Sequence, residues 1–192
     1  SGLDGLSEDD VLLALHDDRP RLRELGVRLA ENELQGKVLD VVLDLVNDAD
    51  DRVRFQIALS LGETQDARLA AALAQLSRSD ASDGWMRTAI LSSSLNVSGA
   101  ILVELLGDEA WSSTPGAVEM LKQLATIVGG RNQPQELVAV LQALEQVDSS
   151  SSATALRSTV LGLGEGLRRS GASLGPHLVS APKVQARVEK LV

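Results

Sequence analysis

The sequence contains no cysteine and no tyrosine, and only one phenylalanine and two tryptophans among 192 residues. Without cysteine the chain forms no disulfide, thiolate zinc site, cysteine nucleophile or covalent haem attachment. With so few aromatic residues, the core has to consist of leucine, valine, isoleucine and alanine. Hydrophobic residues still make up 44% of the chain, and a core rich in leucine and alanine favours helices.

Positive charge is scarce as well, because 18 lysines and arginines face 27 aspartates and glutamates, for a net charge of −9. Nucleic-acid binding depends on basic residues at phosphates and aromatic residues against bases. We therefore expect no nucleic-acid partner and no attraction to an anionic membrane. No apolar run approaches the roughly 18 residues of a membrane-spanning helix, so we expect no membrane insertion.

Strand patterns are nearly absent, and apolar residues recur instead at helical spacing between short polar or glycine-containing breaks. Ser7, with Asp10 three residues later, predicts a capping box at the first helix. The pattern predicts about eleven helices and no sheet. Their approximate ranges are 7–15, 20–32, 34–47, 51–61, 67–76, 84–95, 98–106, 117–128, 134–147, 153–169 and 183–192.

The arginines reveal an internal repeat. Arg23, Arg54 and Arg87 each follow an aliphatic residue or methionine and are 31 and 33 residues apart, and Arg157 follows after about two more steps. A period in the thirties is typical of solenoids built from helix pairs, in which each unit packs only against its neighbours. We expect residues 1–192 to form a single helical-repeat domain, a piece of a longer protein. Ile57 and Leu61 should be buried between units, and the helix 51–61 should be packed on most sides.

Asp50 with Val53 and Arg54, and Asp83 with Met86 and Arg87, resemble the aspartate and arginine of HEAT repeats. The resemblance implies an all-α, HEAT-like α-solenoid, a right-handed superhelix of antiparallel helix pairs. It also implies a ladder of Asp50, Arg54, Asp83 and Arg87 that braces neighbouring units. Arg23 and Arg157 match only the arginine, since neither has an aspartate four residues earlier.

The stretches 52–63, 85–93 and 162–167 resemble more narrowly the HEAT region of large multidomain bacterial proteins, typical of planctomycetes and their relatives. In those proteins a propeller domain similar to sugar dehydrogenases precedes the repeats and a c-type cytochrome domain follows. This resemblance implies a periplasmic or cell-envelope location. The propeller and the haem motif lie outside this sequence, so no redox activity is carried over to it.

Candidate chemical sites are few. His16 and His177 are far apart and lack a third partner, which argues against a metal site. The glycines of 162–166 resemble a phosphate loop but fall inside a helical pattern, which favours close helix packing or a kink. The serine runs 92–94 and 149–152 have no histidine or lysine base nearby, and we interpret them as a polar helix face and a linker.

We therefore expect no catalytic residue, cofactor or metal, and a scaffold or spacer whose partner is a protein or the neighbouring domains of its own parent chain. In HEAT-like proteins the second helix of each pair usually lines the concave face. This implies a candidate surface of Gln56, Ser60, Thr88 and Ser92. The alternative is an enzyme on a HEAT-like scaffold, either DNA glycosylase-like or chromophore lyase-like. A glycosylase needs a basic groove with aromatic residues, and no specific residue indicates a lyase.

Overall fold

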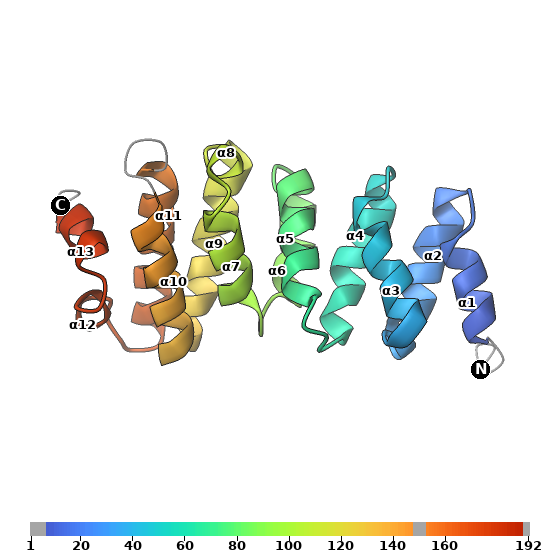
Figure 1. Ribbon diagram of the computed structural model, residues 1–192, viewed down its shortest axis with the longest axis horizontal. Coiled ribbons are helices and arrows are strands. Elements are labelled where there is room, and N and C mark those ends of the chain that lie inside the picture. The colour runs from blue at the N-terminus through green and yellow to red at the C-terminus, as the bar shows by residue number, and fades with distance from the viewer. Residues whose placement is uncertain (1–6, 148–152, 190–192) are drawn as a thin grey trace.

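The computed structural model describes residues 7–147 and 153–189, which form thirteen α-helices, three short 3-10 turns and no strand. Ten of the helices form five antiparallel pairs that stand side by side, with α1 and α13 at opposite ends of the stack (Figure 1). The pairs, called units 1 to 5, are α1 (Glu8–Leu15) with α2 (Pro20–Ala30), α3 (Gly36–Asp44) with α4 (Asp51–Ser60), α5 (Leu69–Asp80) with α6 (Gly84–Ser93), α7 (Ser98–Leu106) with α9 (Pro115–Arg131), and α10 (Pro134–Gln146) with α11 (Ala153–Arg169).

The helices form two rows. The second helices α2, α4, α6, α9 and α11 pack against one another in order along one row, while α5, α7 and α10 pack in order along the other. The short helix α13 (Pro182–Glu189) packs on α10 at the C-terminal end. The turns inside units 1 to 4 follow the upper edge of the stack in Figure 1, and the connections between units follow the lower edge. The expected all-α solenoid of helix pairs is confirmed.

The repeat is visible in the helix starts. The residues that precede α2, α4, α6 and α9 are Arg19, Asp50, Asp83 and Thr114, which are 31, 33 and 31 residues apart. Asp50, Asp83 and Thr114 accept a hydrogen bond from a backbone N–H of the first helical turn, a cap that stabilises a helix by about 1 kcal/mol. The predicted capping box of Ser7 is also present at α1.

The number of helices differs from the predicted eleven because two short helices form in stretches that lack helical periodicity. These are α8 (Glu109–Ser112) in the turn of unit 4 and α12 (Gly175–Leu178) before α13. Helix α5 also extends to Asp80, beyond its predicted end near residue 76. The predicted stop at residues 129–130 is wrong: α9 runs to Arg131, and Asn132 ends it with a φ of 50°, a left-handed conformation that asparagine tolerates.

Ile57 and Leu61 are completely buried, as predicted, together with Val53. Helix α4 is packed on most sides, as predicted, although Leu59 is 40% exposed and Phe55 is half-buried. The neighbours α2 and α6 flank α4, and the connection η2 (Leu45–Asn47) packs against it too. The remaining side of α4 faces solvent.

The backbones of α9 and α11 approach each other closely at glycines. A Cβ added to Gly166 would meet the carbonyl oxygen of Thr126, and would lie 2.6 Å from the nitrogen of Gly130. A Cβ on Gly162 would meet the carbonyl oxygen of Lys122, and one on Gly129 that of Leu163. These glycines therefore allow close helix packing, as the helical pattern around them predicts. The run 149–152, interpreted as a linker, lies outside the described residues.

Candidate interaction surface

In units 1 to 3, the fourth residue of the second helix is an arginine. Its side chain forms hydrogen bonds with the turn that precedes this helix. The Nη1 of Arg23, Arg54 and Arg87 donates hydrogen bonds to the backbone carbonyls six and five residues earlier. The accepting carbonyls belong to Asp17 and Asp18 for Arg23 (2.8 and 3.0 Å), to Asp48 and Ala49 for Arg54 (2.7 and 3.3 Å), and to Ala81 and Ser82 for Arg87 (2.7 and 3.2 Å). The sequence repeat therefore reflects a repeated hydrogen-bond pattern.

Two of these arginines also bind the next unit. Arg23 donates from Nε and Nη2 to the two carboxylate oxygens of Asp48, at 2.6 and 2.9 Å. Arg54 binds Asp80 in the same way, at 2.7 Å for both bonds. The Asp48 side chain is only 3% exposed. Two-pronged arginine–carboxylate pairs are stronger and more directional than single ones, so each arginine fixes its own turn to the following one.

The acidic partners in this ladder are Asp48 and Asp80, and not the predicted Asp50 and Asp83. The carboxylates of Asp50 and Asp83 are occupied as helix caps, where they accept the N–H of Arg52 and of Met86. An aspartate that caps its own helix start points at the backbone and not at the next unit.

The predicted members Arg54 and Arg87 differ in their second contact. Arg54 binds Asp80, which lies 26 residues later in the chain. The residues 25 and 26 positions after Arg87 are Ser112 and Ser113, which have no carboxylate. Arg23 joins the ladder without an aspartate four residues earlier, whereas Arg157 is exposed on α11. The ladder thus spans units 1 to 3.

We expect Asp48→Asn to lower the free energy of unfolding by about 1–3 kcal/mol at neutral pH, since Arg23 loses its buried charged partner. Burial by itself raises the pKa of Asp48, but hydrogen bonds from Arg23 and the Asp50 backbone, with the charge of Arg23, outweigh it and lower the pKa. A lowered pKa means that this stabilisation is present above the ordinary aspartate pKa of about 4 and is lost as pH falls below it. Thermal unfolding between pH 7 and pH 2 should show the difference between wild type and variant shrinking with acidification. An equally large effect of Asp9→Asn, at an exposed position, would contradict it.

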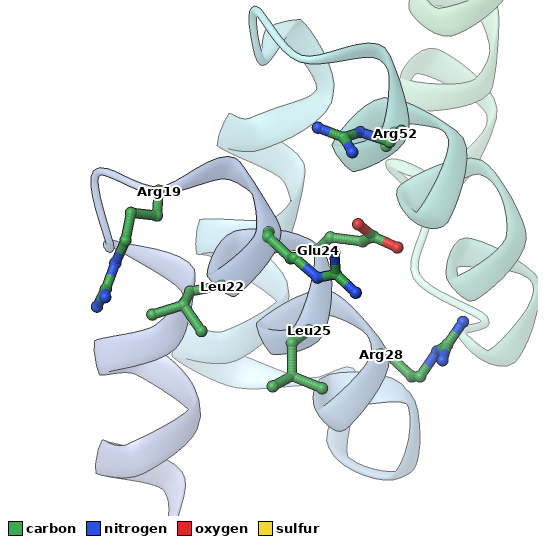
Figure 2. A pocket seen from close by; sticks show the side chains of 7 residues that line it. Arg19, Leu22, Glu24, Leu25, Arg28 and Arg52 are labelled. Atoms are coloured by element: carbon green, nitrogen blue, oxygen red, sulfur yellow. The ribbon is translucent and has the colours of Figure 1, made fainter.

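A hollow of about 600 Å³ lies over α2 and the start of α4. Its polar lining consists of four arginines and one glutamate, and Leu22 and Leu25 supply its apolar part. Figure 2 shows these side chains spread around one opening, with Arg19 and Arg52 at different sides of it and Glu24 between Arg52 and Arg28 in this view. The arginines are Arg19, Arg21, Arg28 and Arg52. This basic site on an acidic chain is called the arginine hollow below.

A second hollow, of about 320 Å³, adjoins the first because Arg52 lines both. Its apolar walls come from Phe55, Trp85 and Met86, and its acidic walls include Asp51 and Asp83. Trp85 is 78% exposed. A tryptophan that is this exposed beside a hollow is typical of protein-binding surfaces, where tryptophan contributes strongly to affinity.

The arginine ladder lies within a single stretch of the chain, from Asp17 to Asp80. Residues 8–94 match the family model for HEAT repeats. The match covers units 1 to 3, which are the units that carry the ladder, and units 4 and 5 continue the same row arrangement beyond it. The fold is therefore a HEAT-like α-solenoid. No curated protein and no solved structure matches the chain significantly. The narrower resemblance to multidomain dehydrogenase and cytochrome proteins accordingly receives no support.

Two of the four residues predicted on the candidate concave surface are buried. Gln56 is 5% exposed and Ser60 is 1% exposed. Their side chains bond to each other and to the Glu31 carboxylate of unit 1: Gln56 Nε2 donates to Glu31 at 3.0 Å, and Ser60 Oγ donates to it at 2.8 Å. This part of the prediction is wrong, because the polar side of α4 faces unit 1 and not solvent.

Thr88 and Ser92 are exposed, but each hydroxyl bonds to a backbone carbonyl of its own helix, that of Gly84 at 2.9 Å and that of Ala89 at 2.7 Å. The residues that the sequence interpretation missed are Arg21, Leu25 and Trp85. A helical-wheel comparison could have found the last two. Trp85 is the second residue of α6, and Leu25 is the sixth residue of α2. Positions four residues apart fall on the same side of a helix with 3.6 residues per turn.

His16 and His177 lie at opposite ends of the solenoid, and the ring Nδ1 of His16 is 2.7 Å from the carbonyl oxygen of Leu12. Among residues 7–147 and 153–189, no group of three or more His, Cys, Asp or Glu side chains is placed to hold a metal ion. Within the same residues, no helix is long and apolar enough to cross a membrane.

Proposed function

We propose that this chain is a non-catalytic scaffold or spacer, and that the exposed face of its second helices binds a protein, either a separate partner or the neighbouring domains of its own parent chain. HEAT repeats generally serve as scaffolds for protein interactions. The observation that carries the proposal is the apolar character of this face. Leu25, Leu59, Trp85 and Leu161 are 45%, 40%, 78% and 55% exposed, and they belong to α2, α4, α6 and α11.

The positions of these residues in their helices support a common face. In each helix they lie at the second, sixth or ninth residue, which a rotation of about 100° per residue places on one side. The two hollows open between them over α2, α4 and α6. Aromatic and aliphatic anchors beside hollows supply most of the affinity in many protein interfaces.

A binding experiment tests the proposal. The other domains of the parent chain, or a candidate partner, are titrated against wild type and the Trp85→Ala and Leu59→Ser variants by calorimetry. We expect each variant to weaken binding by about tenfold, or 1.4 kcal/mol, while the melting temperature changes little because these side chains are exposed.

Leu13→Ser is the matched control. Leu13 is 75% exposed on α1, a first helix, so its loss should leave binding unchanged. Binding that depends on Leu13 but not on Trp85 or Leu59 would place the interface on the opposite row of helices and refute the proposed surface.

A further inference from the structure

The arginine hollow has a charge opposite to that of the chain. The net charge is −9, yet the hollow is lined by four arginines against Glu24 alone. Two of the four are partly neutralised. Arg19 pairs with Asp17 at 2.9 Å, and Arg52 pairs with Asp50 at 3.2 Å. In both cases the aspartate lies two residues earlier and also accepts the N–H of that arginine, so its position is set by the turn.

Arg21 and Arg28 keep most of their donors available. Both are exposed, and neither forms an ion pair with a carboxylate in the described part of the chain. Arg28 makes one long hydrogen bond of 3.4 Å to Gln56 Oε1. A guanidinium carries five N–H donors in a planar fork that fits a carboxylate with two parallel hydrogen bonds. Each of these two arginines can therefore bind one anionic group by donating hydrogen bonds to it.

The hollow also has an apolar component. Leu25, which is 45% exposed, and Leu22 lie between the arginines on α2. A free phosphate or other small anion would leave this leucine surface in water. A peptide that presents carboxylates on both sides of an aliphatic side chain would cover it, and burial of that side chain would add to the affinity.

We propose that the arginine hollow binds an acidic segment of a protein partner, with carboxylates on Arg21 and Arg28 and an aliphatic side chain on Leu22 and Leu25. This rests on the proposed function and names the chemistry of the partner. A nucleic acid fits less well, because no aromatic residue lines the hollow for base stacking.

The test uses the full chain and fluorescence anisotropy with three labelled probes of equal length: a peptide of glutamates around a central leucine, the same peptide with glutamines in place of glutamates, and an oligothymidylate. We expect the glutamate peptide alone to bind, and more weakly as salt is raised, because exposed charges are screened. Arg21→Ala and Leu25→Ser should each weaken binding about tenfold. Arg157→Ala, which removes an exposed arginine on α11, should have no effect.

Equal binding of the glutamate and glutamine peptides, or equal loss in Arg157→Ala, would overturn the inference. So would preferential binding of the oligothymidylate, or no binding of any probe to a chain whose circular dichroism shows it to be folded. These outcomes leave the proposed function testable on its own, since the Trp85→Ala and Leu59→Ser variants report on the wider face. If those variants lose partner binding while the peptide fails to bind, the scaffold proposal stands and the acidic-segment proposal falls.

Discussion

Gly166→Leu is expected to destabilise the protein by about 3 kcal/mol or more and to separate α9 from α11. The Cβ alone would meet backbone atoms of Thr126, Gly129 and Gly130, and backbone cannot move aside as the end of a flexible side chain can. Inserting extra atoms into a packed interior commonly costs about 1–3 kcal/mol when side chains can adjust, and here α11 itself has to shift. For a chain of this size we expect the melting temperature to fall by about 6–12 °C.

The matched control is Gly164→Leu, two residues away in the same helix. A Cβ at Gly164 meets nothing within 4 Å, and replacing a helical glycine by a better helix former stabilises the helix by up to about 1 kcal/mol. The same change should therefore have opposite signs at the two positions. Thermal unfolding followed by circular dichroism measures both, and hydrogen exchange of α9 and α11 locates the effect. Equal stabilisation by both leucines would show that α9 and α11 do not touch through their backbones.

Ile57→Ala is expected to lower the free energy of unfolding by about 2–5 kcal/mol, the range for removing a buried isoleucine side chain beyond its Cβ. Ile57 is fully buried on α4, between α2 and α6. Units of a solenoid are stabilised by their neighbours, so a cavity at unit 2 should also weaken units 1 and 3. Denaturant titration measures the loss of stability, and hydrogen exchange should show it in α2 and α6 as well as α4.

Leu59→Ala serves as the comparison for Ile57→Ala, since it removes a similar side chain from the same helix. Leu59 is 40% exposed, so its truncation should leave little or no cavity and cost less than about 1 kcal/mol. A result in which the two variants are equally destabilised would mean that the face of α4 at Leu59 is covered in solution.

The sequence predicts the helix pairs well, since the apolar spacing and the positions of Arg23, Arg54 and Arg87 both reflect the repeat. It does not predict which aspartate each arginine binds. Asp48 and Asp50 stand two residues apart in the same turn, and only the three-dimensional course of the turn decides that one caps α4 while the other meets Arg23.

Polarity also misleads when neighbours are unknown. The resemblance places Gln56 and Ser60 of α4 on the candidate surface, because the second helices of HEAT-like proteins usually line the concave face. Glu31 of unit 1 reverses the assignment, because its carboxylate binds both polar side chains in the interior. A buried hydrogen-bond network between units is invisible in the periodicity of one helix, whereas the side that carries Leu59 and Trp85 remains exposed.

The arginine ladder also restricts which changes of length the chain can absorb. The ladder arginines, Arg23 and Arg54, each bind two carbonyls of their own turn, six and five residues earlier in the chain. Each also binds a carboxylate 25 or 26 residues later. An insertion or deletion in the turns of units 1 to 3 would move a carboxylate or a carbonyl out of reach of its arginine. The turn of unit 4 lies beyond the last acidic partner, and it is there that the structure holds an additional helix, α8. The residues that precede α6 and α9 are still 31 residues apart, so α8 changes the shape of this turn without changing the length of the repeat.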